Sequence, residues 1–209
     1  MDLRTELFER YPCLCACEKD IDAARELICE TYRRGGTVYV CGNGGSCSDS
    51  DHIVGELMKG FLLRRKLQAA DTAKFAEMFE DGAEFAANLQ GALPAVSLTA
   101  QTAILSAFAN DVEPDMVYAQ LVYGYAREND LVIGLSTSGN SKNVVNAIKA
   151  AKFRGAKTLS MTGMKESKLS AMSDVTIRVP ETETFKIQEL HLPVYHYLCA
   201  AVEEEFFGK

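Results

Sequence analysis

TVYVCGNGGS, residues 37–46, joins a short apolar run to a loop that contains three glycines. The apolar run, Thr37–Cys41, is nearly continuous, which is typical of a parallel strand buried on both faces. Comparable runs follow along the chain at Ala95–Thr99, Leu131–Ser136, Thr158–Thr162 and Val175–Val179. Strand-like runs that alternate with helix-like segments predict an α/β protein with one parallel sheet.

The segments between these strands have helical patterns. We predict helices at Ile21–Tyr32, Ser46–Leu63, Asp111–Arg127, Asn143–Phe153 and Ile187–Phe206. Right-handed crossovers would then give a doubly wound, five-stranded sheet of flavodoxin-like order 2-1-3-4-5, flanked by helices. We expect a single domain with an N-terminal helix in residues 1–36, an α/β core at 37–183 and a C-terminal helix at 184–207.

Residues 64–91 interrupt the alternation of strands and helices. They carry Phe75, Met78, Phe79 and Phe85 at helical spacing. This spacing predicts an inserted helical hairpin or an irregular cover, rather than a second domain. Such an insertion could pack on an edge of the sheet, shape the mouth of a site, or form an oligomer contact.

Charge and composition exclude several classes of partner. The net charge is −7, from 22 basic and 29 acidic residues, which disfavours nucleic acid as a partner. No apolar run approaches the roughly 18 residues of a membrane helix. The segment MDLRTELFERYP at the N-terminus lacks the apolar region of a signal peptide. We therefore expect a cytoplasmic protein with no membrane partner.

The chain has seven cysteines, an odd number that predicts free thiols. Cys13, Cys15 and Cys17 alternate along the sequence, unlike the C-x2-C pairs of zinc knuckles. A metal role is the alternative, but small apolar residues on an N-terminal segment are the favoured interpretation.

Two loops predict a phosphate site. Asn43, Gly44, Gly45 and Ser46 follow the first strand and open a helix, where backbone N–H groups and the helix dipole attract anions. This loop is neither G-x-G-x-x-G nor a Walker A loop, which disfavours a nucleotide. Four hydroxyls follow the third strand, where a helix cap needs only one; they belong to Ser136, Thr137, Ser138 and Ser141. Both loops flank the switch point of the predicted sheet.

Two further sets of residues are candidates for acid/base or metal chemistry. His52 and Glu56 are four residues apart on the helix that begins at the glycine-rich loop, so they share one face of it. Gln188 and His196 lie on the last helix, about 12 Å apart along its axis. One straight helix would not easily bring both to one small site, so one of them could serve a neighbouring subunit. His191 is interpreted as structural.

Together, CGNGGS-x5-H-x3-E, A-N-D, STSGNS-x-N-V and IQE-x-H-x4-H resemble the phosphoheptose isomerases of the SIS (sugar isomerase) family. The resemblance covers nearly the whole chain apart from residues 64–91. It implies binding of sedoheptulose 7-phosphate and a homotetramer with active sites at subunit contacts. It also implies the roles of single residues: catalysis by Glu56 and His196, substrate contacts at Asn110, Asp111 and Gln188, and zinc bound by His52, Glu56, Gln188 and His196.

These residue types suit aldose–ketose isomerisation through an enediol. A carboxylate can remove the proton beside the carbonyl, and an imidazole can move a proton between the two oxygens. A zinc ion could polarise the carbonyl, although Glu56 would then be both ligand and base.

Some positions depart from the family pattern. Gln101 and Ala103 stand where the family commonly has aspartate and serine, and TETFK at 182–186 lacks an aspartate found in some members. An isomerase of another sugar phosphate, or a non-catalytic protein that binds sugar phosphate or a replication initiator, are the alternatives.

Overall fold

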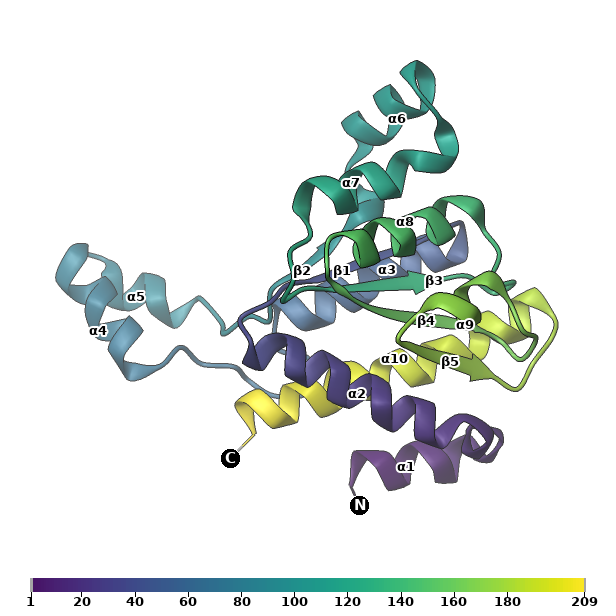
Figure 1. Ribbon diagram of the computed structural model, residues 1–209. Helices are drawn as coiled ribbons and strands as arrows, with labels where there is room; N and C mark the ends of the chain where they lie inside the picture. Colours follow the sequence, from purple (N-terminus) through teal and green to yellow (C-terminus); the bar gives the residue numbers. More distant parts are fainter. Residues whose placement is uncertain (1, 209) are drawn as a thin grey trace.

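The computed structural model describes residues 2–208 and confirms the predicted α/β architecture (Figure 1). All strand pairs are parallel, and the order is β2-β1-β3-β4-β5. The strands are β1 (Val38–Gly42), β2 (Ala95–Ser97), β3 (Leu131–Leu135), β4 (Lys157–Gly163) and β5 (Val175–Val179). Because β1 and β3 pair in register up to Gly42 and Leu135, the loops that follow them leave the sheet side by side.

Helices cover both faces of the sheet, and each face has its own apolar core. One core contains buried side chains of α2 (Glu18–Arg33), α3 (Gly45–Met58) and α10 (Thr184–Phe207). The other contains those of α7 (Val117–Tyr125) and α8 (Lys142–Phe153). Side chains of β1 alternate between the two cores, as a strand buried on both faces requires.

α10 is a 24-residue helix with Pro193 in its interior, and it confirms the helix predicted at the C-terminus. It runs beside α2 and α3 in the first core (Figure 1). Within residues 2–208, no helix is both long and apolar enough to cross a membrane.

The N-terminal segment contains two α-helices instead of the single helix that the sequence predicted. α1 (Leu3–Arg10) is capped by Asp2, and the 3-10 helix η1 (Pro12–Cys17) turns the chain into α2. Cys13 and Cys15 are exposed on this turn, whereas Cys17 is buried.

The helix predicted at Asp111–Arg127 is wrong in its first part. The chain instead forms α6 (Thr102–Asp111), the 3-10 turn η3 (Pro114–Met116) and then α7. Pro114 explains the break, because the residue before a proline is pushed out of helical geometry, and Glu113 is indeed extended. Two short helices were not predicted: η2 (Leu98–Ala100), which precedes α6, and α9 (Lys168–Met172), which precedes β5.

The insertion at residues 64–91 is a helical hairpin of α4 (Ala69–Met78) and α5 (Gly82–Ala87). The rings of Phe75 and Phe85 meet between the two helices, with centroids 5.3 Å apart. Figure 1 shows the hairpin projecting from the body of the protein, and α4 buries none of its residues. Packing on an edge of the sheet, one of the roles considered for it, is therefore not what the hairpin does.

Candidate active site

The glycine-rich loop lies at the carboxyl end of β1. Gly44 has a φ of +57°, which favours glycine, and α3 starts at the next residue without a side-chain cap. A Cβ atom at Gly45 would lie 2.1 Å from the amide nitrogen of Gln188. Glycine at this position therefore lets Gln188 of α10 contact the loop. Ser46 is buried beneath it.

The hydroxyl-rich loop lies beside it, at the carboxyl end of β3. The Oγ atom of Ser136 is 3.0 Å from that of Ser141 and 3.5 Å from that of Ser138. Gly139, with a φ of +65°, closes the turn. Ser141 is the N-cap residue of α8, but its side chain bonds no helix N–H group. In the first turn of α8, the N–H group of Val144 donates to Oδ1 of Asn143 at 3.0 Å, and those of Lys142 and Asn143 are left for an anion.

Two side chains outside the predicted set hold the loops together. The amides of Asn43 and Asn143 face each other at 2.8 Å, and the hydroxyl of Tyr118 donates to the carbonyl oxygen of Gly42 at 2.8 Å. Asn143 lies within the STSGNS-x-N-V pattern and could have been found from it. Tyr118 comes from α7, and no local signal marks it.

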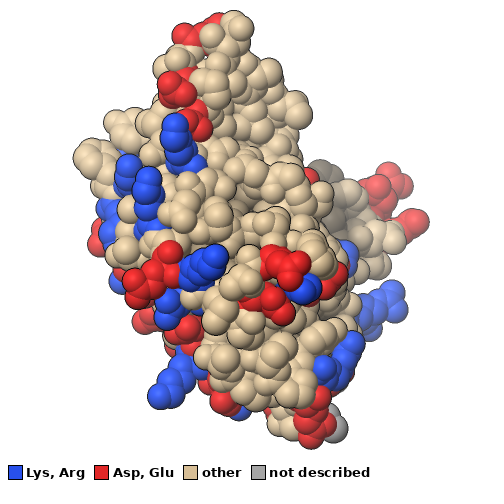
Figure 2. Space-filling view, turned by 90° about the vertical axis from the view of Figure 1, so that its right-hand side faces the viewer, with Lys and Arg blue, Asp and Glu red and all other residues tan. Residues whose placement is uncertain are grey.

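The surroundings of these loops are largely uncharged. Figure 2 looks onto the side toward which the strands point, and much of that surface carries neither acidic nor basic side chains. A pocket of about 250 Å³ opens there beside Thr137, Ser138 and Asn140. Its charged lining residues are Lys165, Glu166 and Glu181. Hydroxyls and backbone N–H groups thus supply most of the donors that could hold a phosphate.

α10 lies along α3, and a line of hydrogen bonds joins them. Gln188 donates to Asp49 at 3.2 Å, and the hydroxyl of Tyr195 donates to the other oxygen of Asp49 at 3.2 Å. The same hydroxyl is 3.1 Å from Nδ1 of His52. Gln188 and His196 of α10 therefore face neighbouring turns of α3. Their spacing along α10 does not by itself require a second subunit.

Asp49 was missed by the sequence analysis. It is buried, and burial raises its pKa, while the hydrogen bonds from Tyr195 and Gln188 oppose that rise. An acidic residue three positions before His52 on the same helix was the available signal, since this spacing places both on one face. Tyr195 precedes a predicted site residue, but only the pairing of the helices shows its role.

The acid/base residues meet at the other end of this line. Nε2 of His52 is 3.3 Å from Oε1 of Glu56, and Lys59 bonds the second oxygen of Glu56. The rings of His52 and His196 are 5.0 Å apart. Burial, and then the proximity of His52, lowers the pKa of His196, which favours a neutral imidazole near pH 7. The structure thus brings Glu56, His52 and His196 together.

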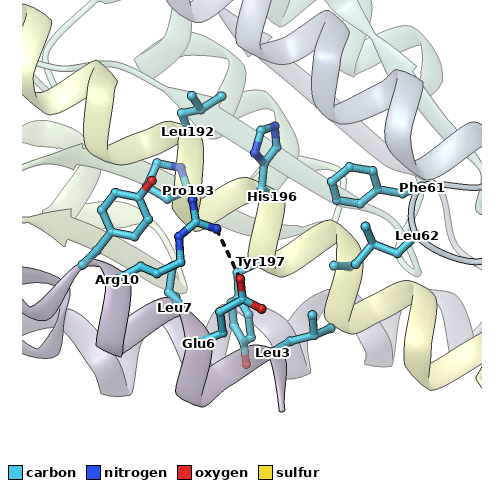
Figure 3. Close-up of a pocket in the computed structure, with 12 residues that line it drawn as sticks. Leu3, Glu6, Leu7, Arg10, Phe61, Leu62, Leu192, Pro193, His196 and Tyr197 are labelled. Atoms are coloured by element: carbon cyan, nitrogen blue, oxygen red, sulfur yellow. Dashed lines mark hydrogen bonds and ion pairs between the residues drawn. The ribbon is translucent and has the colours of Figure 1, made fainter. Parts of the chain in front are cut away.

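A pocket of about 290 Å³ leads to His196 (Figure 3). In Figure 3, α1 closes one side of it, and Phe61 and Leu62 approach from the turn after α3. The ring of Phe61 lies 5.7 Å from that of His196. The imidazole of His196 thus borders a pocket that lies between α1, α10 and the turn after α3.

The remaining predicted residues lie apart or are structural. Asn110 and Asp111 are exposed at the end of α6 and bond each other at 2.8 Å. Gln101 and Ala103 lie at the start of α6. His191 is fully buried with Nε2 3.4 Å from the carbonyl oxygen of Thr162, and burial lowers its pKa to about 4. It therefore has the character of a structural histidine.

The predicted metal ligands divide into two parts. His52, Glu56 and His196 adjoin one another, whereas Gln188 bonds Asp49 beside the glycine-rich loop. Within residues 2–208, no three histidine, cysteine or acidic side chains are arranged so that they could hold a metal ion. Among the described residues, Nε2 of His196 is buried with no hydrogen-bond partner, as is Nδ1 of His191. Of the two, only the nitrogen of His196 lies in the cluster with His52 and Glu56, where a cation or a substrate atom could bind it.

Comparison with known proteins shows the family of this chain. Models of the SIS domain match residues 14–84 and 90–201. The phosphoheptose isomerase of Helicobacter pylori strain Shi470 is 36% identical over 93% of this chain and 92% of its own length. That of Akkermansia muciniphila is 32% identical over 96% of this chain and 93% of its own. The chain belongs to the SIS family, among the phosphoheptose isomerases.

Solved structures of the family have the same fold. A phosphoheptose isomerase from Neisseria gonorrhoeae aligns with a TM-score of 0.75 at 29% identity, covering 96% of this chain and 94% of that one. One from Francisella tularensis aligns with a TM-score of 0.77 at 26% identity, covering 93% and 91%. This SIS protein is therefore an isomerase by family, and its two candidate phosphate loops follow β1 and β3, where the strand order reverses.

Proposed function

We propose that this SIS protein converts sedoheptulose 7-phosphate to D-glycero-D-manno-heptose 7-phosphate through an enediol. The observation that carries the proposal is the alignment of α3 and α10. The contacts between these two helices form a line from the glycine-rich and hydroxyl-rich loops to the cluster of His52, Glu56 and His196. An elongated sugar phosphate fits such a line, with its phosphate at the loops and its carbonyl end at the cluster. The similarity to phosphoheptose isomerases supports the same substrate.

The residues divide the work between binding and proton transfer. Ser136, Ser138, Ser141 and the loop amides hold the phosphate, and Gln188 lies where it can orient the adjoining carbons. Glu56 takes the proton from C1 and returns it to C2. His196 carries a proton between the two oxygens, a task that its lowered pKa and neutral imidazole suit.

A zinc ion is proposed as a cofactor, with His52, Glu56 and His196 as its residues and Gln188 turned toward it. The unpartnered nitrogen of His196 supports this proposal. The positively charged side chain of Lys59 bonds the carboxylate of Glu56. It would have to move away from that carboxylate when a cation binds there. When bound, zinc would supply polarisation of the substrate carbonyl. Elemental analysis of protein purified without chelator tests the proposal, and the absence of metal together with full activity in chelator would contradict it.

A homotetramer with sites at subunit contacts is also proposed, from the family resemblance. The exposed apolar side chains of the hairpin, Met78, Phe79 and Phe85, support an association. Sedimentation of the purified chain tests the assembly, and a tetramer is the expected result. A monomer in sedimentation would refute the idea. The cytoplasmic location stays a prediction from the sequence.

A different ketose phosphate is the second candidate substrate. Gln101 and Ala103 replace an aspartate and a serine of the family pattern, and Gln101 directly precedes α6. The deciding experiment incubates the protein with a panel of ketose phosphates and follows aldose formation. Turnover of sedoheptulose 7-phosphate above all others would support the first proposal. Turnover of another member alone would keep the mechanism and replace the substrate, and no turnover would favour a binding protein.

A further inference from the structure

Glu203 is a carboxylate enclosed near the end of α10. Its side chain has no exposed surface, and each oxygen accepts two hydrogen bonds. Three come from the backbone N–H groups of Phe61, Leu62 and Leu63, at 2.7, 2.7 and 2.9 Å. The fourth comes from Nε of Arg65 at 2.7 Å. Burial alone would raise the pKa of Glu203, but these donors lower it, so the carboxylate is charged.

Arg65 is equally enclosed, and each of its nitrogens has a partner. Nε donates to Glu203, Nη1 donates to the carbonyl oxygen of Leu57 at 2.6 Å, and Nη2 donates to that of Glu56 at 2.9 Å. Its guanidinium also lies over the ring of Phe207, 4.8 Å from the centroid. The two carbonyls belong to the last turn of α3, where no N–H group of the helix reaches them. That of Leu57 also accepts from the N–H group of Leu93 at 3.0 Å. Arg65 therefore caps the helix that carries Glu56.

The Arg65–Glu203 pair connects the two helices of the acid/base cluster. Glu203 lies seven residues after His196 on α10, two turns further along the same face. Arg65 donates a hydrogen bond to the backbone carbonyl oxygen of Glu56 itself. Phe61, whose N–H group Glu203 binds, places its ring against His196. A shift of either charged residue would thus be transmitted to Glu56 and to His196.

Stability alone does not account for such a pair. Desolvation of two buried charges cancels much of their attraction, and well-packed apolar residues often replace them without loss of stability. What apolar residues cannot do is hold three N–H groups of a turn and two carbonyls of a helix end in fixed directions. The contacts of this pair are directional ones, made to backbone atoms beside Glu56 and His196.

We propose that Arg65 and Glu203 are positioning residues, which set the placement of the Glu56 carboxylate relative to His196 during proton transfer. This inference rests on the proposed isomerase function. It assigns the pair no contact with substrate. Displacement of a base by about 1 Å costs on the order of 100-fold in rate, so loss of the pair should act on turnover and leave phosphate binding intact.

The test compares Arg65→Lys and Glu203→Gln with the wild-type chain. Arg65→Lys keeps the charge but cannot reach Glu203 and two carbonyls together. Glu203→Gln keeps the shape but places a donor against backbone donors. We expect kcat to fall about 10- to 100-fold, while KM and the inhibition constant of inorganic phosphate change less than about twofold. Deuterium at C1 of the substrate should slow the variants more than the wild type, because a displaced base makes proton transfer limiting.

Two controls separate positioning from loss of stability. Val122→Ala, a change of a buried α7 side chain in the core on the other face of the sheet, should lower the melting temperature without changing kcat. The double variant Arg65→Met, Glu203→Leu removes both charges; it should be more stable than either single variant and remain slow. The proposal is wrong if the double variant recovers the wild-type kcat together with its stability. It is also wrong if the single variants have the wild-type kcat.

A crystal structure of the Glu203→Gln chain gives a readout that needs no turnover. We expect the turn at residues 59–65 to move and to carry Glu56 away from His52. An unmoved Glu56 would overturn the positioning role whatever the substrate is. Absence of wild-type turnover on every ketose phosphate, with Glu56 displaced in the variant, would instead refute the isomerase function and leave the positioning of Glu56 standing.

Discussion

At the phosphate end of the site, the candidate groups come from two short turns, Asn43–Ser46 and Ser136–Ser141, each directly after a strand. At the acid/base end, they come from side chains far apart in the chain: His52 and Tyr195 are 143 residues apart. The first end is built mostly from backbone geometry, glycines and hydroxyls. The second depends on how α3 and α10 are held together by buried polar groups, among them Asp49, Arg65 and Glu203.

This difference indicates which changes each end tolerates. A turn at a strand end is fixed by its own few residues, so substitutions there should alter binding locally. The acid/base end is fixed by long-range contacts, so substitutions there should alter turnover even when they do not touch the substrate. The predictions below test this division, from the largest expected effect to the smallest.

Glu56→Gln should abolish most turnover, because glutamine keeps the shape of the side chain but cannot accept the carbon-bound proton. We expect kcat to fall by about 10²–10⁴-fold with KM nearly unchanged. Steady-state kinetics on the best ketose phosphate measure both values, and Glu77→Gln on the exposed face of α4 is the matched control. Wild-type turnover of Glu56→Gln would exclude Glu56 as the base.

His191, on the helix that joins the two ends, should make stability depend on pH. Its folded-state pKa is about 4, whereas the ordinary value is 6.5. Below pH 6.5 the unfolded chain therefore takes up a proton that the folded chain does not. The free energy of unfolding should fall as the pH decreases from 6.5 toward 4, by up to about 3 kcal/mol.

His191→Leu removes this titration and should flatten the decrease. Urea unfolding of both chains at pH 7 and pH 5 measures it, and turnover at pH 7 shows whether the helix still aligns the two ends. An equally steep decrease in the variant would show that other groups cause the acid sensitivity.

Ser138→Asp should weaken phosphate binding, because it adds a negative charge where the phosphate is proposed to lie. Repulsion between nearby, partly exposed charges amounts to about 1–4 kcal/mol, so KM should rise roughly tenfold or more while kcat changes little. Ser106→Asp, on the exposed surface of α6, adds the same charge away from the loops. An equal KM in the two variants would remove Ser138 from the phosphate site.

Gly124→Ala should have the smallest effect and leave both ends unchanged. A Cβ atom at Gly124 meets nothing within 4 Å, and alanine favours the helix, so stability should rise by about 0.4–1 kcal/mol. Gly139→Ala is the informative contrast. Its φ is +65° and its Cβ atom would lie 2.1 Å from Oγ of Ser167, so the hydroxyl loop should be destabilised. Thermal unfolding of both variants measures the difference.

The sequence by itself determined the sheet, its strand order and the phosphate-type loops. Continuous apolar runs identify strands buried on both faces, and glycines and hydroxyls directly after β1 and β3 mark candidate anion sites, because both signals depend only on neighbouring residues. His52 and Glu56 could be paired in advance, since one helix fixes their spacing. The break at Pro114 was missed because the helical pattern on both sides of it was read as continuous.

Only the tertiary structure decided how the acid/base end is assembled. From the sequence, Gln188 and His196 were predicted to lie too far apart on one helix for a single site. No local pattern singled out Asp49, Tyr195, Arg65 or Glu203. Their roles arise from the packing of α10 along α3, which brings residues together across more than 130 positions. Burial then makes these groups bond one another, because an unpaired polar group in a protein interior costs free energy that a paired one does not.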